Sequence, residues 1–433
     1  MRPRGQHHYI RSVTFPHFSG SRRGKHPLLD ITPTYFLCSP LLPREYKRRV
    51  ILCGPIGSET DPLTGTELGV FPFRVDRGED IKAFKVDERQ DLLAVVTKCS
   101  VPPSVELQLI QFSRGAPHPS ARTPRIPFFF PGGQKGFDLN CMVQINNDHV
   151  GILVTIVPDG PFPRSQRFFI INWKTGHCKI DHDAGTSEMT SFSFLTFYDL
   201  RIVATNVRDS CIEIWTVRDG RLHRAQTLQL PLRAPKVLVC GLECAPLAPE
   251  DLIPGRRQTE SFIRFMVSLG PESGSTFVCM SIIVDTAYLL AFDLRMRAVT
   301  PWLEWGYRNV FLRDDTSSVE DCNAMGGRHF VSKTFSEEDC YPGTAPNVVT
   351  VVQVTGCRPQ DVHIEFRFKF PKGVPELNGS TTVFAERIMS FVPREMAWSA
   401  DIKCDRVFVH QQRLFAITDD YHKQRTTVDF YWF

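Results

Sequence analysis

The sequence predicts an all-β protein, and three strand-like stretches carry the prediction. Each alternates apolar with polar residues or runs through aromatic and β-branched ones, then ends in a basic residue and, directly or one residue later, a glycine. They are residues 106–115, 166–176 and 211–220. Their terminal glycines lie 61 and 44 positions apart. A four-stranded propeller blade takes roughly 40 to 50 residues. We therefore expect a WD-like β-propeller of six or seven blades, preceded by a short irregular or helical N-terminal segment.

The N-terminal region is expected to lie outside the propeller. Residues 1–29 contain five arginines and one lysine but no acidic residue, which predicts a basic disordered tail over residues 1–40. A mitochondrial presequence is the alternative, because such leaders are also rich in arginine and poor in acid. Pro3 and Pro16 argue against it, since they would interrupt the amphipathic helix of a presequence.

A short helix is expected over residues 41–55. It would begin near Pro43, where the missing N–H of proline does no harm, and would end at the Gly54-Pro55 pair. The propeller would then occupy residues 56–433. No stretch in that region sustains helical spacing beyond two turns, so we expect it to be built almost entirely of strands.

Within the propeller, the first three units are expected to end at the three glycine-terminated strands, and each has two shorter apolar stretches before that strand. The proline-rich segment 116–135 is expected to be a loop insertion in this series. Trp173 and Trp215 lie in or beside two of the strands and are expected to anchor the core. Further strands are expected at residues 237–240, 261–268, 276–283, 287–293, 348–354, 362–370, 405–409, 414–417 and 427–431.

The overall composition excludes several classes of function. A chain of 433 residues with 42% hydrophobic and 23% charged residues can bury a large core, and a net charge of +4 does not indicate a nucleic-acid surface. Thirteen cysteines, scattered singly, predict free thiols in a reducing compartment, the cytoplasm or the nucleus. No apolar run approaches the roughly 20 residues of a membrane-spanning helix. We expect a monomer that contacts neither membrane nor nucleic acid.

Six short motifs occur in order along the chain. They are Asp-Glu-Arg-Gln-Asp-Leu-Leu at 87–93, a strand ending in Gly-Ala-Pro-His-Pro at 107–119, Asn-Asp-His-Val-Gly at 147–151, Asn-Trp-Lys-Thr-Gly at 172–176, Pro-Trp-Leu-Glu-Trp-Gly at 301–306 and Val-Asp-Phe at 428–430. Together they resemble the large basidiomycete family of F-box-type proteins with a WD-like propeller. The resemblance covers about residues 72–433 and implies a fungal protein that recognises substrates or acts as a scaffold.

The resemblance also draws attention to the Leu-Pro-x-Glu run at Leu42, Pro43 and Glu45. An F-box in this family resembles a run of about 45 residues that opens this way and binds the small adaptor subunit of cullin-RING ubiquitin ligases. Here Gly54-Pro55 follows almost at once, so either the F-box has been lost or the chain is truncated or wrongly delimited. Leu42, Pro43 and Glu45 are candidate partner-binding residues on this resemblance.

Trp302 and Trp305 are the other candidate partner-binding residues. They flank a short loop that also holds Glu304. One interpretation is an exposed aromatic hot spot for a protein partner. The alternative is a buried clamp between adjacent blades.

No motif in the sequence predicts catalysis, a metal site or a cofactor site. Cys240 and Cys244 are four apart, but no second pair follows at zinc-ligand spacing. His149 stands beside Asp148, which suggests either acid–base work or a histidine that pins a loop through a hydrogen bond.

The sequence therefore predicts a protein-interaction or scaffold module without enzymatic activity. By resemblance it would be related to the substrate-recognition part of an F-box ubiquitin-ligase adaptor. Two alternatives stay open: a propeller enzyme whose site lies in the central channel, and a decayed family member without activity.

Overall fold

The structure is a computed structural model, and secondary structure dominates the part of the chain that it describes. The described residues are 8–16, 28–32, 34–39, 50–55, 71–74, 80–99, 104–129, 137–158, 165–185, 189–196, 199–231, 237–245, 247, 262–271, 278–292, 298–306, 310–315, 329–334, 347–364, 367–369, 380–382, 388–402, 404, 406–410, 413–420 and 425–432. These residues divide into two compact units. The N-terminal unit comprises residues 8–186 and 417–432, and the central unit comprises residues 187–416.

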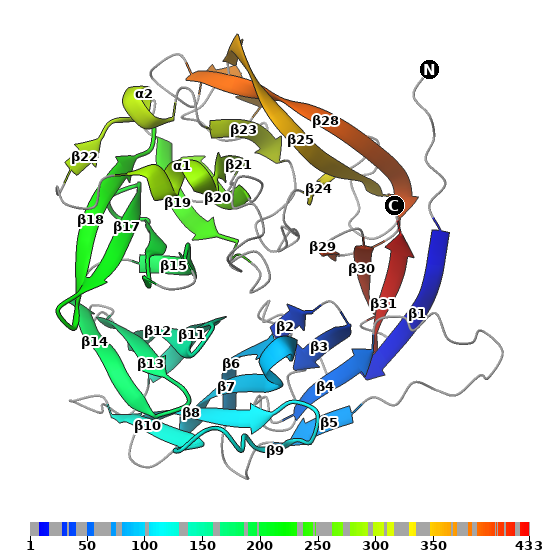
Figure 1. The fold of residues 1–433 in the computed structure, drawn as a ribbon. Coiled ribbons are helices and arrows are strands. Elements are labelled where there is room, and N and C mark those ends of the chain that lie inside the picture. Colours follow the sequence, from blue (N-terminus) through cyan, green and yellow to red (C-terminus); the bar gives the residue numbers. More distant parts are fainter. Residues whose placement is uncertain are drawn as a thin grey trace. The chain divides into compact units, whose positions relative to one another are not determined.

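The N-terminal unit contains three antiparallel meander sheets, which we number I to III (Figure 1). Sheet I consists of β2 (Leu28–Ile31), β3 (Tyr35–Ser39), β4 (Val50–Pro55) and β5 (Phe71–Arg74). Sheet II consists of β6 (Asp80–Asp87), β7 (Leu92–Cys99), β8 (Ser104–Gln111) and β10 (Arg125–Phe129). The two-residue strand β9 (Ala116–Pro117) also pairs with β8, and the 3-10 helix η1 (Glu88–Gln90) lies between β6 and β7. Sheet III consists of β11 (Phe137–Asn146), β12 (His149–Pro158), β13 (Ser165–Asn172) and β14 (His177–Gly185).

A further strand pair in the N-terminal unit joins the first and last described strands. β1 (His8–Pro16) is antiparallel to β31 (Arg425–Trp432), with His8 opposite Trp432 and Pro16 opposite Arg425. β30 (Arg413–Asp420) follows β31 in the order of the same sheet.

The central unit contains two more meander sheets, numbered IV and V. Sheet IV consists of β15 (Met189–Phe194), β16 (Ile202–Asn206), β17 (Cys211–Arg218) and β18 (Arg221–Gln229), extended by β22 (Ala298–Thr300), which is parallel to β18. Sheet V consists of β19 (Val237–Cys244), β20 (Phe262–Pro271), β21 (Val278–Asp285) and β23 (Val310–Asp315). The remaining elements are α1 (Thr286–Ala291), α2 (Trp302–Trp305), β24 (His329–Thr334), β25 (Asn347–Ile364), β26 (Arg367–Lys369), β27 (Ser380–Thr382), β28 (Ile388–Ile402) and β29 (Arg406–His410).

Five sheets of the described chain, I to V, have the organisation of a propeller blade: four strands in chain order, each antiparallel to the next. The predicted count of six or seven blades was wrong. Dividing the chain length by the length of one blade assumes that every residue belongs to a four-stranded blade. β25 and β28 take 18 and 15 residues, yet with β24 they form a sheet of only three strands. β1 and β31 belong to a further four-stranded sheet with β30 and β29, which is not four strands in chain order because β1 comes from the other end of the described chain.

The three glycine-terminated strands are confirmed as equivalent elements. They correspond to β8, β13 and β17, each at an interior position of its sheet. Gly115, Gly176 and Gly220 follow them with φ of 66°, 77° and 70°. Glycine adopts this left-handed backbone without the Cβ penalty that other residues meet, so it ends the strand in a tight turn.

Other parts of the fold differ from the expectation. Segments of the expected tail over residues 1–40 are the strands β1, β2 and β3, because each has a strand partner that local composition does not reveal. Residues 50–55 are the strand β4 and not the end of a helix. The segment 116–135 supplies β9 and β10, so part of the expected insertion is the outer strand of sheet II.

The stretch 287–293, expected to be a strand, begins instead within the helix α1. Asp285 stands at its N-cap, and the side-chain Oδ1 accepts a hydrogen bond from the Ala287 N–H at 2.8 Å. An apolar run of this length suits a short helix as well as a buried strand, and the cap decides between them.

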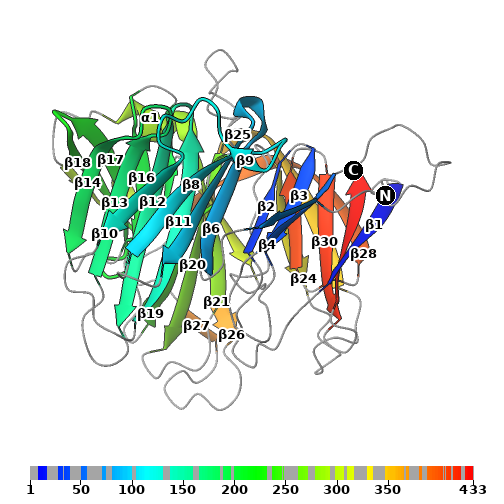
Figure 2. The same ribbon diagram turned by 90° about the horizontal axis from the view of Figure 1, so that it is seen from below.

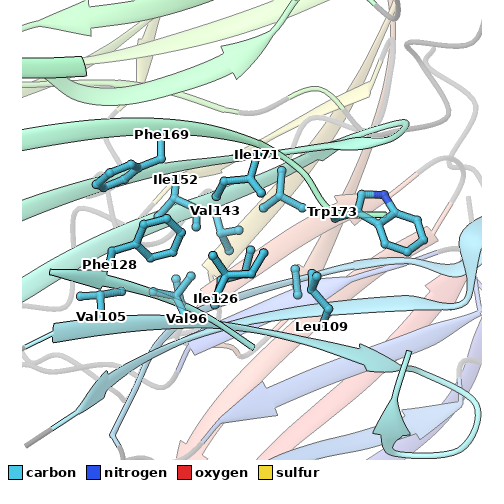
Figure 3. Packing of buried hydrophobic residues seen from close by; sticks show 14 of the residues in the cluster. Val96, Val105, Leu109, Ile126, Phe128, Val143, Ile152, Phe169, Ile171 and Trp173 are labelled. Atoms are coloured by element: carbon cyan, nitrogen blue, oxygen red, sulfur yellow. The ribbon is translucent and has the colours of Figure 1, made fainter. Parts of the chain in front are cut away.

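A hydrophobic core of the N-terminal unit lies between sheets II and III (Figure 3). Phe128 of β10 and Phe169 of β13 face one another across it, with ring centroids 4.6 Å apart. Trp173, at the end of β13, is 1% exposed and closes one end of the cluster, which confirms its expected role as a core anchor. Trp215 is only partly buried and donates its indole N–H to Glu213 at 3.1 Å.

Candidate functional site

The turns at one end of sheets I, II and III are tied to one another by hydrogen bonds, and we call them the rim. The rim comprises residues 32, 34, 35, 87–91, 112–124, 147–148 and 172–176. Figure 2 shows β9 and its loop at the upper end of sheet II, which is the end that carries these turns. Between sheets I and II, the Glu88 carboxylate accepts hydrogen bonds from the Thr32 hydroxyl and from the Thr34 N–H, the latter at 3.1 Å. The rim of the N-terminal unit is our candidate functional site, because it is both exposed in part and firmly braced.

The turn after β6 is organised by the buried carboxylate of Asp87, which is 2% exposed. Asp87 caps η1 by accepting a hydrogen bond from the Arg89 N–H at 3.1 Å. The Gln90 amide bridges two sheets, because its Nε2 donates to Asp87 Oδ2 at 2.9 Å and to the carbonyl oxygen of Asn147 in sheet III at 2.8 Å.

Asp91 ends η1 in the left-handed conformation, with a φ of 54°, and its carboxylate holds the start of the next loop. The Ser113 N–H and hydroxyl both donate to it at 2.6 Å, and Gln111 Nε2 donates at 2.9 Å. Partial burial would raise the pKa of Asp91, but the hydrogen bonds from Ser113 and Gln111 outweigh it and hold this pKa below its usual value.

His118 is the central brace of the loop 112–124 and is 6% exposed. Its Nδ1 accepts a hydrogen bond from the Ser120 N–H at 3.2 Å. The ring proton therefore lies on Nε2, which donates to the Gln90 carbonyl oxygen at 3.0 Å. The imidazole also packs edge-on against the Trp173 ring, with centroids 4.8 Å apart. His118 thus fixes its loop to sheet II and to sheet III at the same time.

The Asn-Trp-Lys-Thr-Gly turn completes the rim in sheet III. Trp173 Nε1 donates to the Asn147 carbonyl oxygen at 3.0 Å, and Lys174 Nζ binds Asp148 at 2.6 Å. The Arg122 N–H donates to the Lys174 carbonyl oxygen at 2.8 Å, so the loop of sheet II docks on this turn. A Cβ at Gly176 would lie 3.0 Å from the Thr123 Cβ, so glycine also permits the close approach.

The histidine that pins a loop is therefore His118, not His149, which the sequence singled out. His149 lies in β12 opposite Asn146 and Asn172. Burial and the nearby charge of Lys179 lower its pKa, and its neighbour Asp148 is engaged with Lys174. The signal for His118 was present in the Gly-Ala-Pro-His-Pro motif, but sequence alone does not show which carbonyl oxygen it reaches.

Trp302 and Trp305 are buried, at 2% and 0% exposed. Their rings meet edge to face with centroids 5.0 Å apart, and Trp305 Nε1 donates to the Gln229 carbonyl oxygen of β18 at 2.7 Å. A Cβ at Gly306 would lie 2.5 Å from Trp302 Cδ2, so the glycine is needed for the ring to pack. The geometry is that of a buried clamp on sheet IV and does not match the exposed hot spot. Any contribution to partner binding stays a prediction.

The other candidate residues, Leu42, Pro43 and Glu45, lie outside the described residues, so their partner-binding role also stays a prediction. Carboxylates on the first strands of sheets II and III serve the fold: Asp80 and Asp138 each bind Lys82 Nζ at 3.0 Å. Within the described residues no group of three or more histidine, cysteine, aspartate or glutamate side chains is arranged to hold a metal ion. Nine cysteines whose side chains the structure describes are thiols that form no disulfide, and burial raises the pKa of Cys141 and Cys244 to about 12.

The meander sheets define the class of protein: an all-β fold of the WD-like propeller type. No helix in the described part of the chain is both long and apolar enough to cross a membrane.

Comparisons with known proteins give similarities of fold and no family. No protein-family model matches the chain, and no characterised protein matches its sequence significantly. Among solved structures it is similar to the WD40 domain of Toxoplasma gondii coronin, with 10% identity and a TM-score of 0.43 over 98% of this chain and 86% of that one. It is also similar to KlAtg21, solved in complex with the coiled coil of AgAtg16, with 7% identity and a TM-score of 0.37 over 75% and 79% of the two chains. Prolyl oligopeptidase B from Galerina marginata matches with 12% identity and a TM-score of 0.31 over 75% of this chain and 37% of that one. No residue role is carried over from these proteins.

Proposed function

We propose that the protein is a protein-interaction module and that the rim of the N-terminal unit is its recognition surface. The observation that carries this proposal is the loop 112–124. Most of its side chains are exposed, yet its backbone is held at both ends and in the middle by hydrogen bonds to sheets II and III. A surface that is already ordered loses little conformational entropy when a partner binds, which favours recognition.

A site-specific cross-linking experiment tests this function. A photoreactive amino acid would replace Ser120, an exposed rim residue, in the full chain expressed in its own cells. The matched control places it at Arg221, an exposed residue at the start of β18 in sheet IV. We expect a discrete cross-linked protein from position 120 and not from position 221. Cross-linking of the same proteins from both positions, or from neither, would contradict a rim-specific interaction.

A second variant links the cross-link to the architecture of the rim. His118→Ala removes the brace to Gln90 and Trp173 but leaves every exposed side chain in place. We expect this variant to lose most of the cross-link at position 120 while the far-ultraviolet circular dichroism keeps its β signature. An undiminished cross-link would show that loop order does not matter for recognition.

As a finer proposal, the module is the substrate-recognition part of an F-box type adaptor. It is supported by the resemblance of six ordered motifs and of Leu42, Pro43 and Glu45 to that family. The test is co-purification of the small adaptor subunit of cullin-RING ligases with the wild-type chain and with a variant in which all three residues are alanine. Recovery with the wild type and loss with the variant would support the adaptor role. No recovery with either would exclude it and leave the interaction module standing.

A further inference from the structure

Two arginines on the rim stand outside the ion pairs of the N-terminal unit. Arg114 and Arg122 are exposed, and neither forms an ion pair within the described part of the chain. Six other cations of the unit are paired with carboxylates: Lys85 with Asp30, Lys82 with Asp80 and Asp138, Arg89 with Asp87, Arg125 with Glu106, Arg167 with Asp181 and Lys174 with Asp148. These ion pairs leave the guanidinium groups of Arg114 and Arg122 available on the rim, while the exposed Lys179 lies on β14, outside the rim.

The backbone of both arginines is fixed, although their side chains are exposed. Arg114 lies in the turn after β8, where the Gly115 N–H donates to the Gln111 carbonyl oxygen at 2.8 Å. The preceding residue, Ser113, is bound to Asp91 through both its N–H and its hydroxyl. Arg122 is held by its own N–H on the Lys174 carbonyl oxygen. Two cationic side chains therefore start from positions that do not have to be ordered when a ligand binds.

The chain between the two arginines sets their separation. Ala116 lies opposite Gln111 and Pro117 opposite Ile110, so the chain after Arg114 runs back along β8 at about 3.3 Å per residue. Past His118 it turns across to sheet III, where Arg122 docks. The exposed residues between the arginines include Ala116, Pro117 and Pro119. The surface is therefore an exposed, partly apolar strip with a guanidinium group toward each end, longer than one small anion would cover.

We propose that Arg114 and Arg122 anchor an extended acidic segment of a partner protein, one that carries aspartate or glutamate side chains. This inference rests on the proposed function of the rim. A planar guanidinium group binds carboxylates through two parallel hydrogen bonds, and prolines offer apolar contact without a backbone N–H that a partner would have to satisfy. A nucleic acid fits less well, because such surfaces need a basic stripe, whereas the rim also carries Glu88, Asp91 and Asp148 and the whole chain has a net charge of only +4.

The test measures binding of the full chain to a short fluorescein-labelled peptide of alternating glutamate and glycine by fluorescence anisotropy at low salt. The comparison probes are the same peptide with glutamine for glutamate and a single-stranded oligonucleotide of equal charge. We expect binding of the glutamate peptide alone, about tenfold weaker for R114E/R122E, and weaker still as salt screens exposed charges. R221E, which reverses one exposed charge on sheet IV, should bind like the wild type, and circular dichroism checks that each variant is folded.

The outcomes separate this inference from the function on which it rests. Equal binding of the oligonucleotide, equal loss of binding in R221E, or no loss in R114E/R122E would overturn the acidic-segment proposal. If no probe binds but position 120 still cross-links a protein, the rim recognises a partner of different chemistry, and only the present inference falls. If position 120 cross-links nothing and no probe binds, both fall.

Discussion

Two joints between neighbouring sheets, one in each unit, are built in different ways. Sheets II and III of the N-terminal unit meet through apolar side chains, including Ile126 and Phe128 on one side and Ile152 and Phe169 on the other. Sheets IV and V of the central unit meet partly through hydroxyl groups. Ser191 Oγ accepts a hydrogen bond from the Cys244 N–H at 2.6 Å, and Ser193 Oγ accepts one from the Leu247 N–H at 3.0 Å.

The serine hydroxyls of the second joint satisfy backbone N–H groups beside a strand at the edge of its sheet. β19 is the first strand of sheet V and pairs only with β20 inside that sheet, so part of its backbone N–H groups face away from any strand partner. Buried N–H groups need an acceptor, and the serines of β15 provide it. β11 is likewise the first strand of sheet III and pairs only with β12 inside that sheet, yet the first joint is filled mainly by apolar side chains, with Lys82 binding Asp138 across it. A propeller-type fold thus tolerates polar inter-sheet contacts where an edge strand is buried.

The largest loss of unfolding free energy is expected when the apolar contact between sheets II and III is disrupted. Phe169→Ala would remove a 2%-exposed ring that packs on Phe128, and we expect a loss of about 3–5 kcal/mol of unfolding free energy through lost burial and the cavity left behind. Urea unfolding followed by tryptophan fluorescence measures it. Phe169→Leu, the matched control, should lose much less. A loss below 1 kcal/mol for the alanine variant, on the order of a surface substitution, would contradict an apolar joint.

The next largest loss of unfolding free energy is expected at the clamp that Trp302 and Trp305 form on sheet IV. It shows that the central unit also has tightly packed contacts. Gly306→Ala would place a Cβ 2.5 Å from the Trp302 ring, which must then shift. We expect a loss of about 1–3 kcal/mol from overpacking. Gly220→Ala is an informative control, because a Cβ there meets nothing within 4 Å and only the φ of 70° is strained. If Gly306→Ala is no less stable than the wild type, the buried clamp is wrong.

The contact between sheets IV and V, which serine hydroxyls bridge, should lose stability when a single acceptor is removed. Ser191→Ala leaves the Cys244 N–H without its oxygen, and we expect a loss of about 1–3 kcal/mol because a buried donor is left unsatisfied. Ser193→Ala tests the second bridge of the same joint. Additive losses in the double variant would indicate independent bridges, whereas a smaller combined loss would indicate one cooperative ladder. Hydrogen exchange at Cys244 should speed up only in variants that carry Ser191→Ala.

The smallest effect is expected from the ion pairs beside the apolar joint. Burial alone would lower the pKa of Lys82, but Asp80 and Asp138 outweigh it and raise this pKa above the ordinary 10.5. A raised pKa in the folded state means that the ion pairs contribute stability fully below pH 10.5, and that this contribution is lost as the pH rises through the folded-state value. Lys82→Met should cost about 1 kcal/mol or less at neutral pH. The difference from the wild type should shrink at alkaline pH, and a difference that grows there would contradict the assignment.

The fold could be predicted from sequence wherever a local pattern determines the structure. Gly115, Gly176 and Gly220 marked three strand ends because a left-handed turn favours glycine whatever lies around it. β1 could not be found in this way, because its strand character depends on β31, more than four hundred residues along the chain. α1 could not be told from a strand by its apolar run, because such a short run suits both elements and only the Asp285 cap before it distinguishes them.

The candidate site was only partly predictable. The motifs around His118 and Trp173 could be recognised, and Trp173 was correctly expected in the core. Their joint role could not be seen, because it depends on carbonyl oxygens of Gln90 and Asn147 that only the packed sheets bring close. Nothing in the sequence separates Arg114 and Arg122 from Arg89 either, because the pairing of Arg89 with Asp87 depends on the geometry of the η1 turn.

The pairing of β1 with β31 has a consequence for the making of the protein. During synthesis the ribosome produces β1 more than four hundred residues before β31. The backbone N–H and C=O groups of β1 that pair with β31 therefore stay unmatched while all the residues between the two strands are made. Nascent chains stalled before Arg425 should expose this unpaired strand to chaperones, and the pairing of β1 with β31 should form only after residues 425–432 have left the ribosome.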